Sequence, residues 1–454
     1  MRIGLRLQGT SCRALVLDGH SVVAAAAAVR CTTLAEAVDT TFEELRHELG
    51  TEITKVTDIT SDAGRVLAAR KPASVIAIRI SPRPPADAFH VTGLPALVEP
   101  VVARTVHVGG GHDLRGRPLA PLGLEAFLAE LPGILSGEVR NIAITSVGST
   151  ASKDHETRIA DAILSSDSEM RISISSDFYS SVFRDRDYTA ILNSALMETG
   201  EDLAAMLDAS GRRHFPSATM WFAKNDGGRA PLARLAVIPI HGLRPEPAMQ
   251  ILGAATLAGA PDGEVVICAD SGVTVGQIRG GLPATRSVIR QGYEASLASN
   301  AAVVEPYTAD HPVRPAVPSV IADLRSGQDT PLPFGLVPTL AAAHDAGQVG
   351  SAVAPLTAWI DRLETVSGRA DLQLVQRRAE EDAESAAVQL GASPGLTRII
   401  ESNVYAMPYG NPGIVRIRVQ AAGEVSGDTI EDAAEIHVRT PFGAEEGAGR
   451  WAPC

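Results

Sequence analysis

The stretch Arg2-Ile-Gly-Leu-Arg-Leu-Gln-Gly-Thr-Ser-Cys-Arg-Ala-Leu-Val-Leu-Asp-Gly-His20 decides the fold class, because it predicts a strand, a turn, a second strand and a second turn. Gly9-Thr10-Ser11 forms the first turn and Asp18-Gly19 the second. Asp-Gly is a strong hairpin signal, since glycine accepts positive φ and aspartate bonds to its own backbone. Residues 21–30 continue as a third strand, so we expect the chain to open on a hairpin meander.

The meander is followed by segments that alternate between helix and strand, which is the pattern of a layered α/β domain. Apolar residues recur at helical spacing in residues 33–49. Short β-branched runs predict buried strands, and the stretches between them predict helices. The expected strands are 74–80, 141–145, 218–223 and 265–269, and the expected helices are 123–135, 156–164 and a pair within 188–207.

The last third of the chain is predicted to be less regular. Prolines are dense between Val303 and Pro338, which indicates an irregular connection or a lid. Residues 370–390 have the pattern of a charged amphipathic helix, and residues 404–419 predict a strand pair broken by Pro408-Tyr-Gly-Asn-Pro-Gly413. Residues from Pro441 onward are expected to fray. No repeat of solenoid period is visible in the sequence.

The composition is that of a globular protein with two lobes or domains. Of 454 residues, 45% are hydrophobic and 20% are charged. The formal charge of −13 would repel nucleic acid and anionic membranes, so neither is expected as a partner. The apolar run near the start is far shorter than the roughly 20 residues of a membrane span. The four cysteines lack metal-ligand spacing, and a cytoplasmic location is expected.

Several blocks in colinear order resemble the hydantoinase/oxoprolinase family, in the shorter form of its ATP-dependent, hydantoinase A-type subunit. Arg184-Asp-Arg-Asp-Tyr-Thr-Ala-Ile-Leu-Asn193 resembles the family's E-R-x-x-T-x-x-x-N segment. Lys224-Asn-Asp-Gly-Gly228 resembles its N-D-G turn. The remaining matches are Met1-Arg-Ile-Gly4 with Asp18-Gly19, His107-Val-Gly-Gly-Gly-His112 with Gly116-Arg-Pro-Leu-Ala-Pro121, Asp154-His-Glu156, Tyr405-Ala-Met-Pro-Tyr-Gly-Asn-Pro-Gly413 and Arg416-Ile-Arg-Val-Gln-Ala-Ala-Gly-Glu424.

The resemblance implies a two-lobed, actin-like ATPase (ribonuclease H-like) fold of the α/β class, in which two glycine-rich hairpin loops hold ATP. It implies an N-terminal lobe over residues 1–190, a core lobe with a closing helix and strands over 191–440, and a flexible tail over 441–454. Active members of the family open cyclic amides such as hydantoins or 5-oxoproline, by phosphorylating the substrate from ATP with a divalent cation.

The first of the two implied loops departs from the family pattern. A loop that cradles phosphate needs glycines, a hydroxyl donor and a carboxylate for the hydrated cation. The family pattern D-x-G-G-T aligns with Arg6-Leu-Gln-Gly-Thr10, so an arginine replaces the carboxylate and a glutamine replaces one glycine. Gly9, Thr10 and Ser11 remain as candidate nucleotide-binding residues. Arg6 is expected in a salt bridge or in solvent, and pairing with phosphate is the alternative.

The second implied loop departs as well. The family pattern D-x-G-G-T-T-x-D aligns with Ile267-Cys-Ala-Asp-Ser-Gly-Val-Thr274, and neither aspartate is in register. Asp270, Ser271, Gly272 and Thr274 supply an acid, hydroxyls and a glycine in shifted positions, and Asp270 is the candidate metal ligand. The alternative is that Asp270 begins an ordinary Asx-type turn. Near the nucleoside, Ala301-Ala-Val-Val-Glu-Pro306 replaces a glycine triplet of the family.

Three hypotheses for the function follow from these loops. The first is a catalytically impaired family member that binds or regulates a partner, either another hydantoinase/oxoprolinase-type subunit or a second copy of this chain. The second is an ATP-dependent hydrolase of a hydantoin, 5-oxoproline or a lactam with altered phosphate loops, which would use Mg-ATP. The third is a non-catalytic sensor of a small molecule or nucleotide. Only the active enzyme calls for a cofactor.

Three further groups each have a functional and a structural interpretation. His107 and His112 flank three glycines and could seat an anion or a metal, or could be solvated loop residues. His155 and Glu156 could be an acid/base pair, or could mark a helix start with Asp154 as its N-cap. The charged residues 184–187 could equally be an ion network between lobes.

Overall fold

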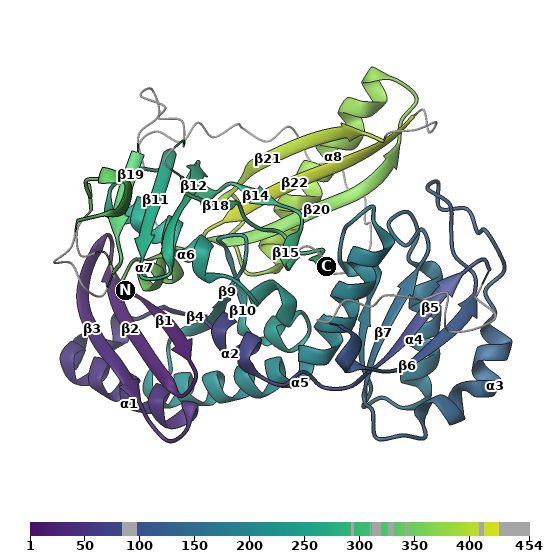
Figure 1. Ribbon diagram of the computed structural model, residues 1–454, viewed down its shortest axis with the longest axis horizontal. Coiled ribbons are helices and arrows are strands. Elements are labelled where there is room, and N and C mark those ends of the chain that lie inside the picture. The colour runs from purple at the N-terminus through teal and green to yellow at the C-terminus, as the bar shows by residue number, and fades with distance from the viewer. Residues whose placement is uncertain are drawn as a thin grey trace. The chain divides into compact units, whose positions relative to one another are not determined.

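The computed structural model describes residues 1–83, 98–291, 295–308, 310, 319–325, 331–340, 343, 345–407 and 413–425. The chain forms two compact units, Met1–Pro355 and Leu356–Cys454. Both are built of helices and β-sheets, which confirms the expected α/β class (Figure 1). The domain bounds that we expect at residues 190 and 440 stay predictions, and the tail lies outside the described residues. Among the described helices, none is long and apolar enough to cross a membrane.

The first unit opens on the predicted meander. Strands β1, β2 and β3 pair antiparallel in turn, and β4 joins β1 in parallel on its other side, within the order β10-β9-β4-β1-β2-β3. Alternate side chains of β1 face opposite sides of the sheet, so Ile3 and Leu5 lie in the large hydrophobic core that also contains residues of α1 and α5, while Gly4 faces helix α7. The bounds are β1 (Arg2–Gln8), β2 (Ser11–Asp18), β3 (Ser21–Arg30), α1 (Leu34–Leu49), β4 (Asp58–Asp62), α2 (Gly64–Ala69), β9 (Thr219–Ala223) and β10 (Arg229–Pro231).

A second sheet repeats the arrangement of the first four strands. Its order is β13-β12-β11-β19, with β11 antiparallel to β12, β12 antiparallel to β13 and β11 parallel to β19. Strands β18 and β19 lie inside the proline-rich stretch that we predict to be irregular, so that prediction is wrong for residues 304–306 and 319–323. The bounds are α6 (Glu246–Leu257), β11 (Gly263–Ala269), β12 (Gly272–Arg279), β13 (Leu282–Pro283), β14 (Thr285–Arg286), β15 (Ile289–Gln291), β16 (Ala295–Leu297), β17 (Ala301–Ala302), β18 (Val304–Pro306), β19 (Ser319–Asp323) and α7 (Ala346–Val353).

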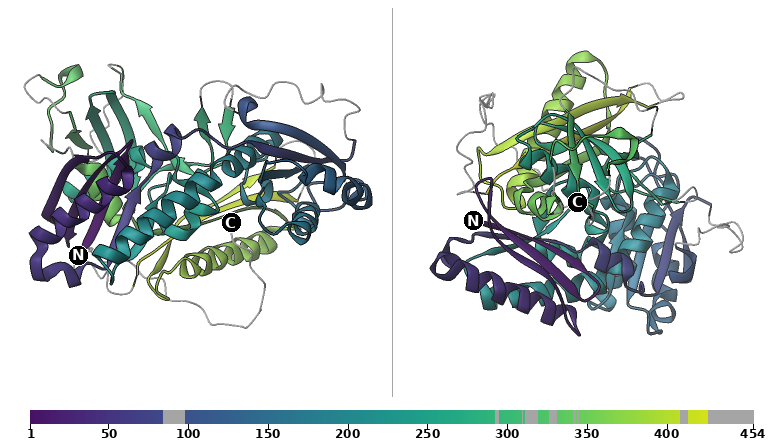
Figure 2. Two further views of the ribbon diagram at one scale, coloured as in Figure 1. Left: turned by 90° about the horizontal axis from the view of Figure 1, so that it is seen from below. Right: turned by 60° about the vertical axis from the view of Figure 1, so that its left-hand side comes forward.

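A third sheet, in the order β6-β5-β7-β8, is entirely parallel. One face carries isoleucines and valines that pack against helices α3 and α4. The other face meets α5, a single helix of 32 residues (Figure 2) where the sequence predicts a pair. The bounds are β5 (Val75–Ser81), β6 (Val102–Gly109), α3 (Leu124–Leu135), β7 (Asn141–Ser146), α4 (Asp154–Ser166), β8 (Arg171–Ile174) and α5 (Phe183–His214).

The second unit contains the predicted helix and strand pair. Strands β20 (Leu356–Thr365), β22 (Ile414–Gly423) and β21 (Thr397–Ala406) form antiparallel pairs, with β22 in the middle. Helix α8 (Arg369–Gln389) packs against them and buries mainly alanines. On β22, Arg418 stacks over Trp359 at 4.1 Å. Residues 408–412, where we expect the break between strands, lie outside the described part of the chain.

Helices α6 and α7 cross at backbone contact. A β-carbon at Gly253 of α6 would overlap the carbonyl oxygen of Ala346, and one at Gly350 of α7 would overlap that of Met249. On the opposite side of α7, a β-carbon at Gly4 of β1 would overlap the carbonyl oxygen of Gln348. Glycine at these positions therefore lets α6, α7 and β1 approach more closely than side chains would allow.

Strand β3 is the outer strand of the first sheet, and its pairing with β2 is interrupted twice. Val23 and the pair Ala27–Ala28 lie at these register shifts, where β3 has one more residue than β2. The backbone N–H of Ala25 donates to the Glu48 carboxylate of α1 at 3.3 Å. Bulges and a charged side chain of this kind blunt the edge of a sheet.

The glycines of α7 allow a matched test of the crossing. Replacing glycine by alanine within a helix normally stabilises it by about 1 kcal/mol. At Gly347 the new β-carbon would lie 3.9 Å from the Gln250 side chain, so Gly347→Ala should preserve or raise the free energy of unfolding. Gly350→Ala should instead lower it by about 3 kcal/mol through overpacking. Urea unfolding of both variants measures the difference, and equal stabilities would contradict the described crossing.

Candidate functional site

The first candidate loop is a two-residue hairpin turn at the tip of β1 and β2. Gln8 and Ser11 are cross-strand partners, and Gly9 has φ +58° with no atom within 4 Å of an added β-carbon. The Ser11 hydroxyl donates to the carbonyl oxygen of Gln8 at 2.9 Å, so it closes the turn. Gly9 and Thr10 are exposed at the tip. The predicted residues Gly9, Thr10 and Ser11 therefore lie together, in a tight turn of ordinary chemistry.

The second candidate loop is also a two-residue turn, made of Asp270 and Ser271 between β11 and β12. Gly272 follows with φ 132°, and Thr274 lies farther along β12, beside Ile267 and Pro306. The structure thus groups the four residues on one hairpin, but Thr274 lies away from the tip.

A cationic group is already present next to the Asp270 turn. The Arg325 guanidinium donates to both carboxylate oxygens of Asp323 at 2.9 Å. The hydrogen bond to Asp323 raises the pKa of Arg325 above its usual value, and the nearby Asp323 and Asp270 carboxylates add to the rise. An arginine in electrostatic contact with Asp270 disfavours the metal site proposed there, because a divalent cation would meet a fixed positive charge.

Arg6 is held in a salt bridge, which is one of the environments expected for it from the sequence. Its guanidinium pairs with Glu246, the first residue of α6. Arg65 binds the same carboxylate from α2 in bidentate fashion, at 2.7 and 2.8 Å. Both arginines and the glutamate lie beside the end of β1, where the family pattern has its first carboxylate. We call Arg6, Arg65 and Glu246 the arginine clasp.

A buried carboxyl group lies next to the clasp at the end of β4. Asp62 is the strand partner of Arg6, is 5% exposed, and accepts a hydrogen bond from the Gly64 N–H at 3.0 Å. Burial raises the pKa of Asp62 to about 6, and Glu246 adds to the rise while Arg6 and Arg65 oppose it. Asp62 therefore titrates much closer to neutral pH than an exposed aspartate does.

The residues that resemble the family's R-x-x-T-x-x-x-N motif act as braces on one side of α5. Arg186 donates to the Ser149 hydroxyl and to the carbonyl oxygens of Ser146 and Ser180. The Thr189 hydroxyl accepts from the N–H of Ala298 at 2.6 Å. These bonds tie α5 to loops that follow three different strands or helices, so the motif supports backbone rather than exposing a reactive group.

Asn193 and Asn225, from the two most specific matching blocks, fasten the stretch before α6. The Asn193 amide donates to the carbonyl oxygen of Val237 and accepts from the N–H of Ile240. Asn225, in the N-D-G turn, accepts from the N–H of Arg244 at 2.6 Å. The matching blocks thus fix the path of residues 237–244.

The charged residues 184–187 do not form one shared network: Asp185, Arg186 and Asp187 make separate contacts, and Arg184 is exposed. Asp187 pairs with Arg79 of β5 at 2.6 Å, with both side chains nearly fully buried. Asp185 accepts from the Ser180 hydroxyl at 2.9 Å. A buried pair of this kind is costly to break but is weak evidence for a site.

Glu156 is a structural residue in this structure. It is fully buried and accepts from the N–H groups of Ser146 and Ser176 and from the Ser175 hydroxyl, at 2.6–2.9 Å. Burial raises the pKa of Glu156 and these donors oppose the rise. All three donors are satisfied by a carboxylate, so Glu156 is an acceptor and not a free acid or base. Asp154 is the first residue of α4 and not its N-cap, which is Lys153.

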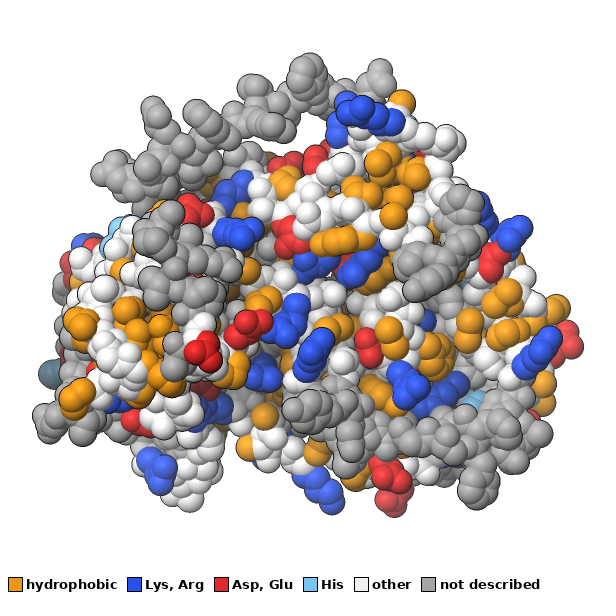
Figure 3. All heavy atoms as spheres, turned by 45° about the horizontal axis from the view of Figure 1, so that its top comes forward, with side chains coloured by type: hydrophobic (Ala, Val, Ile, Leu, Met, Phe, Trp, Pro, Cys, Tyr) orange, Lys and Arg blue, Asp and Glu red, His pale blue; other side chains and the backbone are white. Residues whose placement is uncertain are grey.

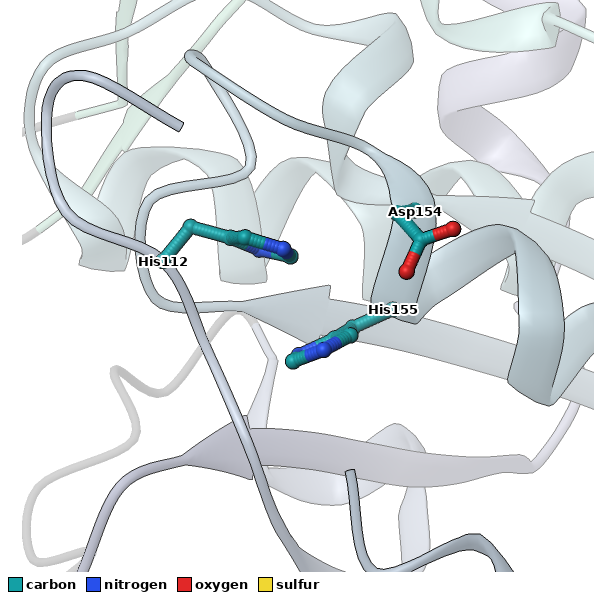
Figure 4. Close-up of side chains that lie close together, drawn as sticks. All are labelled: His112, Asp154 and His155. Atoms are coloured by element: carbon teal, nitrogen blue, oxygen red, sulfur yellow. The ribbon is translucent and has the colours of Figure 1, made fainter. Parts of the chain in front are cut away.

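His112, Asp154 and His155 come together, which the sequence does not predict (Figure 4). Their potential ligand atoms lie within 4.8 Å of one another, and the two histidine rings are 4.1 Å apart. Burial lowers the pKa of both histidines. His107 lies on β6, apart from this group, and burial lowers its pKa as well.

The hydrogen bonding of His155 argues against a metal in this cluster. Its Nδ1 accepts from the backbone N–H of Gly111 at 2.9 Å, so the neutral ring carries its proton on Nε2. A metal-bound histidine needs the opposite arrangement, in which the remaining nitrogen donates. Only His112 and Asp154 are then available as ligands, and two are too few for a zinc site.

Sequence reasoning missed Asp62, Arg65 and Glu246. Glu246 does carry a weak signal, because an acidic residue after Pro245 is typical of a helix start. Nothing in the sequence links it to Arg6, which lies 240 positions earlier. The arginine clasp is therefore visible only in the folded chain.

The structure is similar to two solved proteins. The first is acetone carboxylase in its nucleotide-free form, from work on ATP-dependent acetone carboxylation, with a TM-score of 0.63 and 12% identity over 93% of this chain and 87% of that one. The second is the ATP-dependent caprolactamase from Pseudomonas jessenii, with a TM-score of 0.64 and 11% identity over 98% and 90%. At such identities the likeness shows a shared fold. No protein-family model and no curated protein matches the sequence.

Replacing Asp62 tests the environment of the clasp. The folded pKa of about 6 lies above the unfolded value of about 3.9, so the folded state binds more protons between these values and stability falls as pH rises through that range. An asparagine at this position does not titrate, and its side-chain oxygen can still accept from Gly64. The stability gain of Asp62→Asn should grow between pH 4 and pH 7, up to about 3 kcal/mol. Urea unfolding of both proteins across this range measures the gain. A gain that stays the same at every pH would contradict the raised pKa of Asp62.

Proposed function

We propose that the chain is a divergent, non-catalytic member of the hydantoinase/oxoprolinase family that keeps an actin-like ATPase scaffold in the cytoplasm and supports or regulates a partner. The observation that carries this proposal is the arginine clasp. It places two guanidinium groups and their shared carboxylate where the family pattern holds a carboxylate for the hydrated cation.

The residues present do not fit Mg-ATP. A hydrated magnesium ion needs carboxylate or phosphate oxygens with little competing positive charge. Glu246 is engaged by Arg6 and Arg65, and burial opposes the ionisation of Asp62. At the other loop, Asp270 has Arg325 as its electrostatic neighbour. Both places for a cation therefore have positively charged side chains of the protein nearby.

The actin-like part of the proposal rests on the repeated sheet arrangement. Two sheets share the order of their first four strands, and each presents a two-residue hairpin turn between its first two strands. Thr189, Asn193 and Asn225 accept hydrogen bonds from backbone N–H groups. The blocks that match the family therefore have a structural role that does not require catalysis. Such a scaffold can persist when its surface, and not its chemistry, is under selection.

A second candidate function is an ATP-dependent cyclic amide hydrolase with altered loops. Acetone carboxylase and the caprolactamase, two solved proteins of similar fold, are both ATP-dependent by name. Asp62 adds a carboxyl with a pKa near neutrality at the end of β4, an inner strand of the first sheet, as a general base would require. The two functions differ in whether the wild-type chain binds and turns over Mg-ATP.

Titration with Mg-ATP decides between them. We expect no binding heat for wild type and no ATP turnover above blank with hydantoin, 5-oxoproline or caprolactam. Arg6→Asp with Gln8→Gly should create magnesium-dependent affinity, because it opens the clasp and restores a carboxylate and a glycine. Arg6→Gln with Gln8→Gly is the matched control without the carboxylate, and circular dichroism confirms folding. Wild-type turnover that vanishes in Asp270→Ala would reject the proposal.

The second-loop positions are less suitable for such a repair. Ile267 is 3% exposed within β11, so an aspartate there would bury a charge in the core. The test is therefore confined to the exposed first hairpin and the partly buried Arg6.

The partner of this proposal is another subunit of the hydantoinase/oxoprolinase type, or a second copy. On the face drawn in Figure 3, basic side chains are interspersed with acidic and apolar ones. A mixed surface of this kind suits a protein partner better than a polyanion. The proposal includes neither nucleic acid nor a membrane among the partners.

Purification of the tagged chain from its native host tests the assembly. We expect a second polypeptide, or a second copy, at fixed stoichiometry after size-exclusion chromatography and native mass spectrometry. If the chain has lost its catalytic site, a contact with another subunit is the simplest reason for the fold to be retained. A lone monomer at physiological concentration would remove this part of the proposal.

A further inference from the structure

The loop after β6 crosses the carboxyl ends of two other strands of the third sheet. Strand β6 is the outer strand in the order β6-β5-β7-β8. The N–H of Gly110 donates to the carbonyl oxygen of Ser81, the last residue of β5, at 3.0 Å. The N–H of His112 donates to the carbonyl oxygen of Val147, directly after β7, at 2.8 Å. We call residues 109–119 the glycine strap.

The glycine strap lies close against the end of the sheet. A β-carbon at Gly110 would lie 2.8 Å from the side chain of Ile80 and 2.9 Å from Nδ1 of His155. A β-carbon at Gly148 would overlap the carbonyl oxygen of His112. The carboxyl ends of parallel strands are the edge at which open α/β sheets bind ligands. The strap therefore lies over the edge of the third sheet that is best placed for contacts with other molecules.

One hydrogen bond of the strap depends on a titratable group. The N–H of Gly111 donates to Nδ1 of His155 on α4 at 2.9 Å, and His155 is only 3% exposed. Nδ1 can accept only while it carries no proton. Protonation of His155 would turn a second N–H toward that of Gly111, so the bond would be lost and buried donors would be left unpaired. Glu156, the next residue, instead accepts from N–H groups at the end of β7 and after β8.

His112 of the strap raises the cost of a positive charge at the same place. Its ring lies against that of His155, with the ring centres 4.1 Å apart (Figure 4). His112 is also 3% exposed, and its Nδ1 is buried without a hydrogen-bond partner in the described part of the chain. A proton on that nitrogen would bury an unpaired N–H, and two charged rings would repel each other. The closed strap therefore requires both rings to be neutral.

The charged groups around the two rings are largely exposed and act in opposite directions. On α4, Asp154 favours protonation of both rings, whereas Arg158 opposes protonation of His155. Their side chains are 57% and 48% exposed, so solvent screens both charges. Asp113 favours protonation of His112 but is held in a salt bridge within the strap. Burial is the largest influence, and it lowers the pKa of both histidines.

We propose that His112 and His155 form a pH-sensitive latch, which holds the glycine strap over the ends of β5 and β7 at neutral pH and releases it in acid. In the released strap both rings regain the usual histidine pKa of about 6.5. Because this value is higher than in the closed strap, closure is fully stable above about pH 6.5 and weakens as the pH falls below it. The latch shares no residue with the arginine clasp and does not depend on whether Mg-ATP or a partner binds.

Hydrogen exchange of the full-length chain tests the latch. Mass spectrometry compares residues 109–119 at pH 7.5 and pH 5, with each rate corrected for the intrinsic exchange rate at that pH. A histidine that titrates near pH 6.5 only after release raises the opening constant about tenfold per pH unit below that value. The strap should therefore lose about tenfold or more of its protection at pH 5, while residues of α1 keep theirs. Equal protection of the strap at both pH values would overturn the proposal.

The variant His155→Asn separates the latch from other effects of acid. The asparagine oxygen can accept from the N–H of Gly111 and does not titrate, so protection of the strap at pH 5 should be within about threefold of that at pH 7.5. His107→Asn is the matched control, because His107 is a partly buried histidine of β6 outside the strap. This control should lose protection in acid as wild type does. A full acid loss in His155→Asn, or none in His107→Asn, contradicts the latch.

The protonation state of His155 in folded wild type provides a second readout. With 15N-labelled histidine, the His155 ring should be neutral and protonated on Nε2 at pH 7.5, and its protonation should coincide with the loss of strap protection. A ring protonated on Nδ1 at pH 7.5 contradicts the bond to Gly111 and with it the latch. Protonation of His155 without any change in the strap would also reject it.

Discussion

The backbone contact between α6 and α7 is the constraint on which the first unit depends. Helix α6 belongs to the core of the second sheet, and α7 packs through Val349 and Ala352 against Leu15 and Leu17 of the first. The helix crossing therefore packs between the two sheets and helps to join them. Because glycines form the contact, its separation is set by backbone atoms and leaves little freedom for adjustment. The position of Glu246, and with it the arginine clasp, follows from this crossing.

The parts of the fold that could be predicted are those in which the signal is local. The meander and the two hairpin turns follow from short-range turn chemistry, and the helices over residues 33–49 and 370–390 follow from apolar spacing. Helix α5 is one helix and not two, and Gly200 lies inside it. This glycine does not end the helix; it allows a close contact, since a β-carbon there would overlap the carbonyl oxygen of Leu235. Strand β19 escapes prediction because Ser319 pairs with Glu264, 55 residues earlier on β11 and beyond the reach of local pattern.

The candidate site shows the same division between local and long-range information. The resemblance draws attention to Asn193 and Asn225, but only their hydrogen bonds reveal that they hold backbone in place. A salt bridge of Arg6 can be expected from sequence, while its partner cannot be identified. The tautomer of His155 depends on the backbone N–H of Gly111, which comes from a distant segment of the chain. Chemical roles of this kind are properties of the folded environment.

The protection of strand β3 has a consequence for biosynthesis. Residues 22–29 contain only alanine and valine, a composition with few features that prevent stacking with identical segments. In the folded chain the two bulges and the Glu48 carboxylate limit such stacking. During synthesis, however, Glu48 is added 23 residues after Ala25. At translation rates of about 5–20 residues per second, the strand emerges roughly 1–5 s before the side chain that caps it. During that interval, neighbouring nascent chains on one messenger are the most dangerous partners, and slow elongation over residues 30–48 would raise the fraction lost to aggregation.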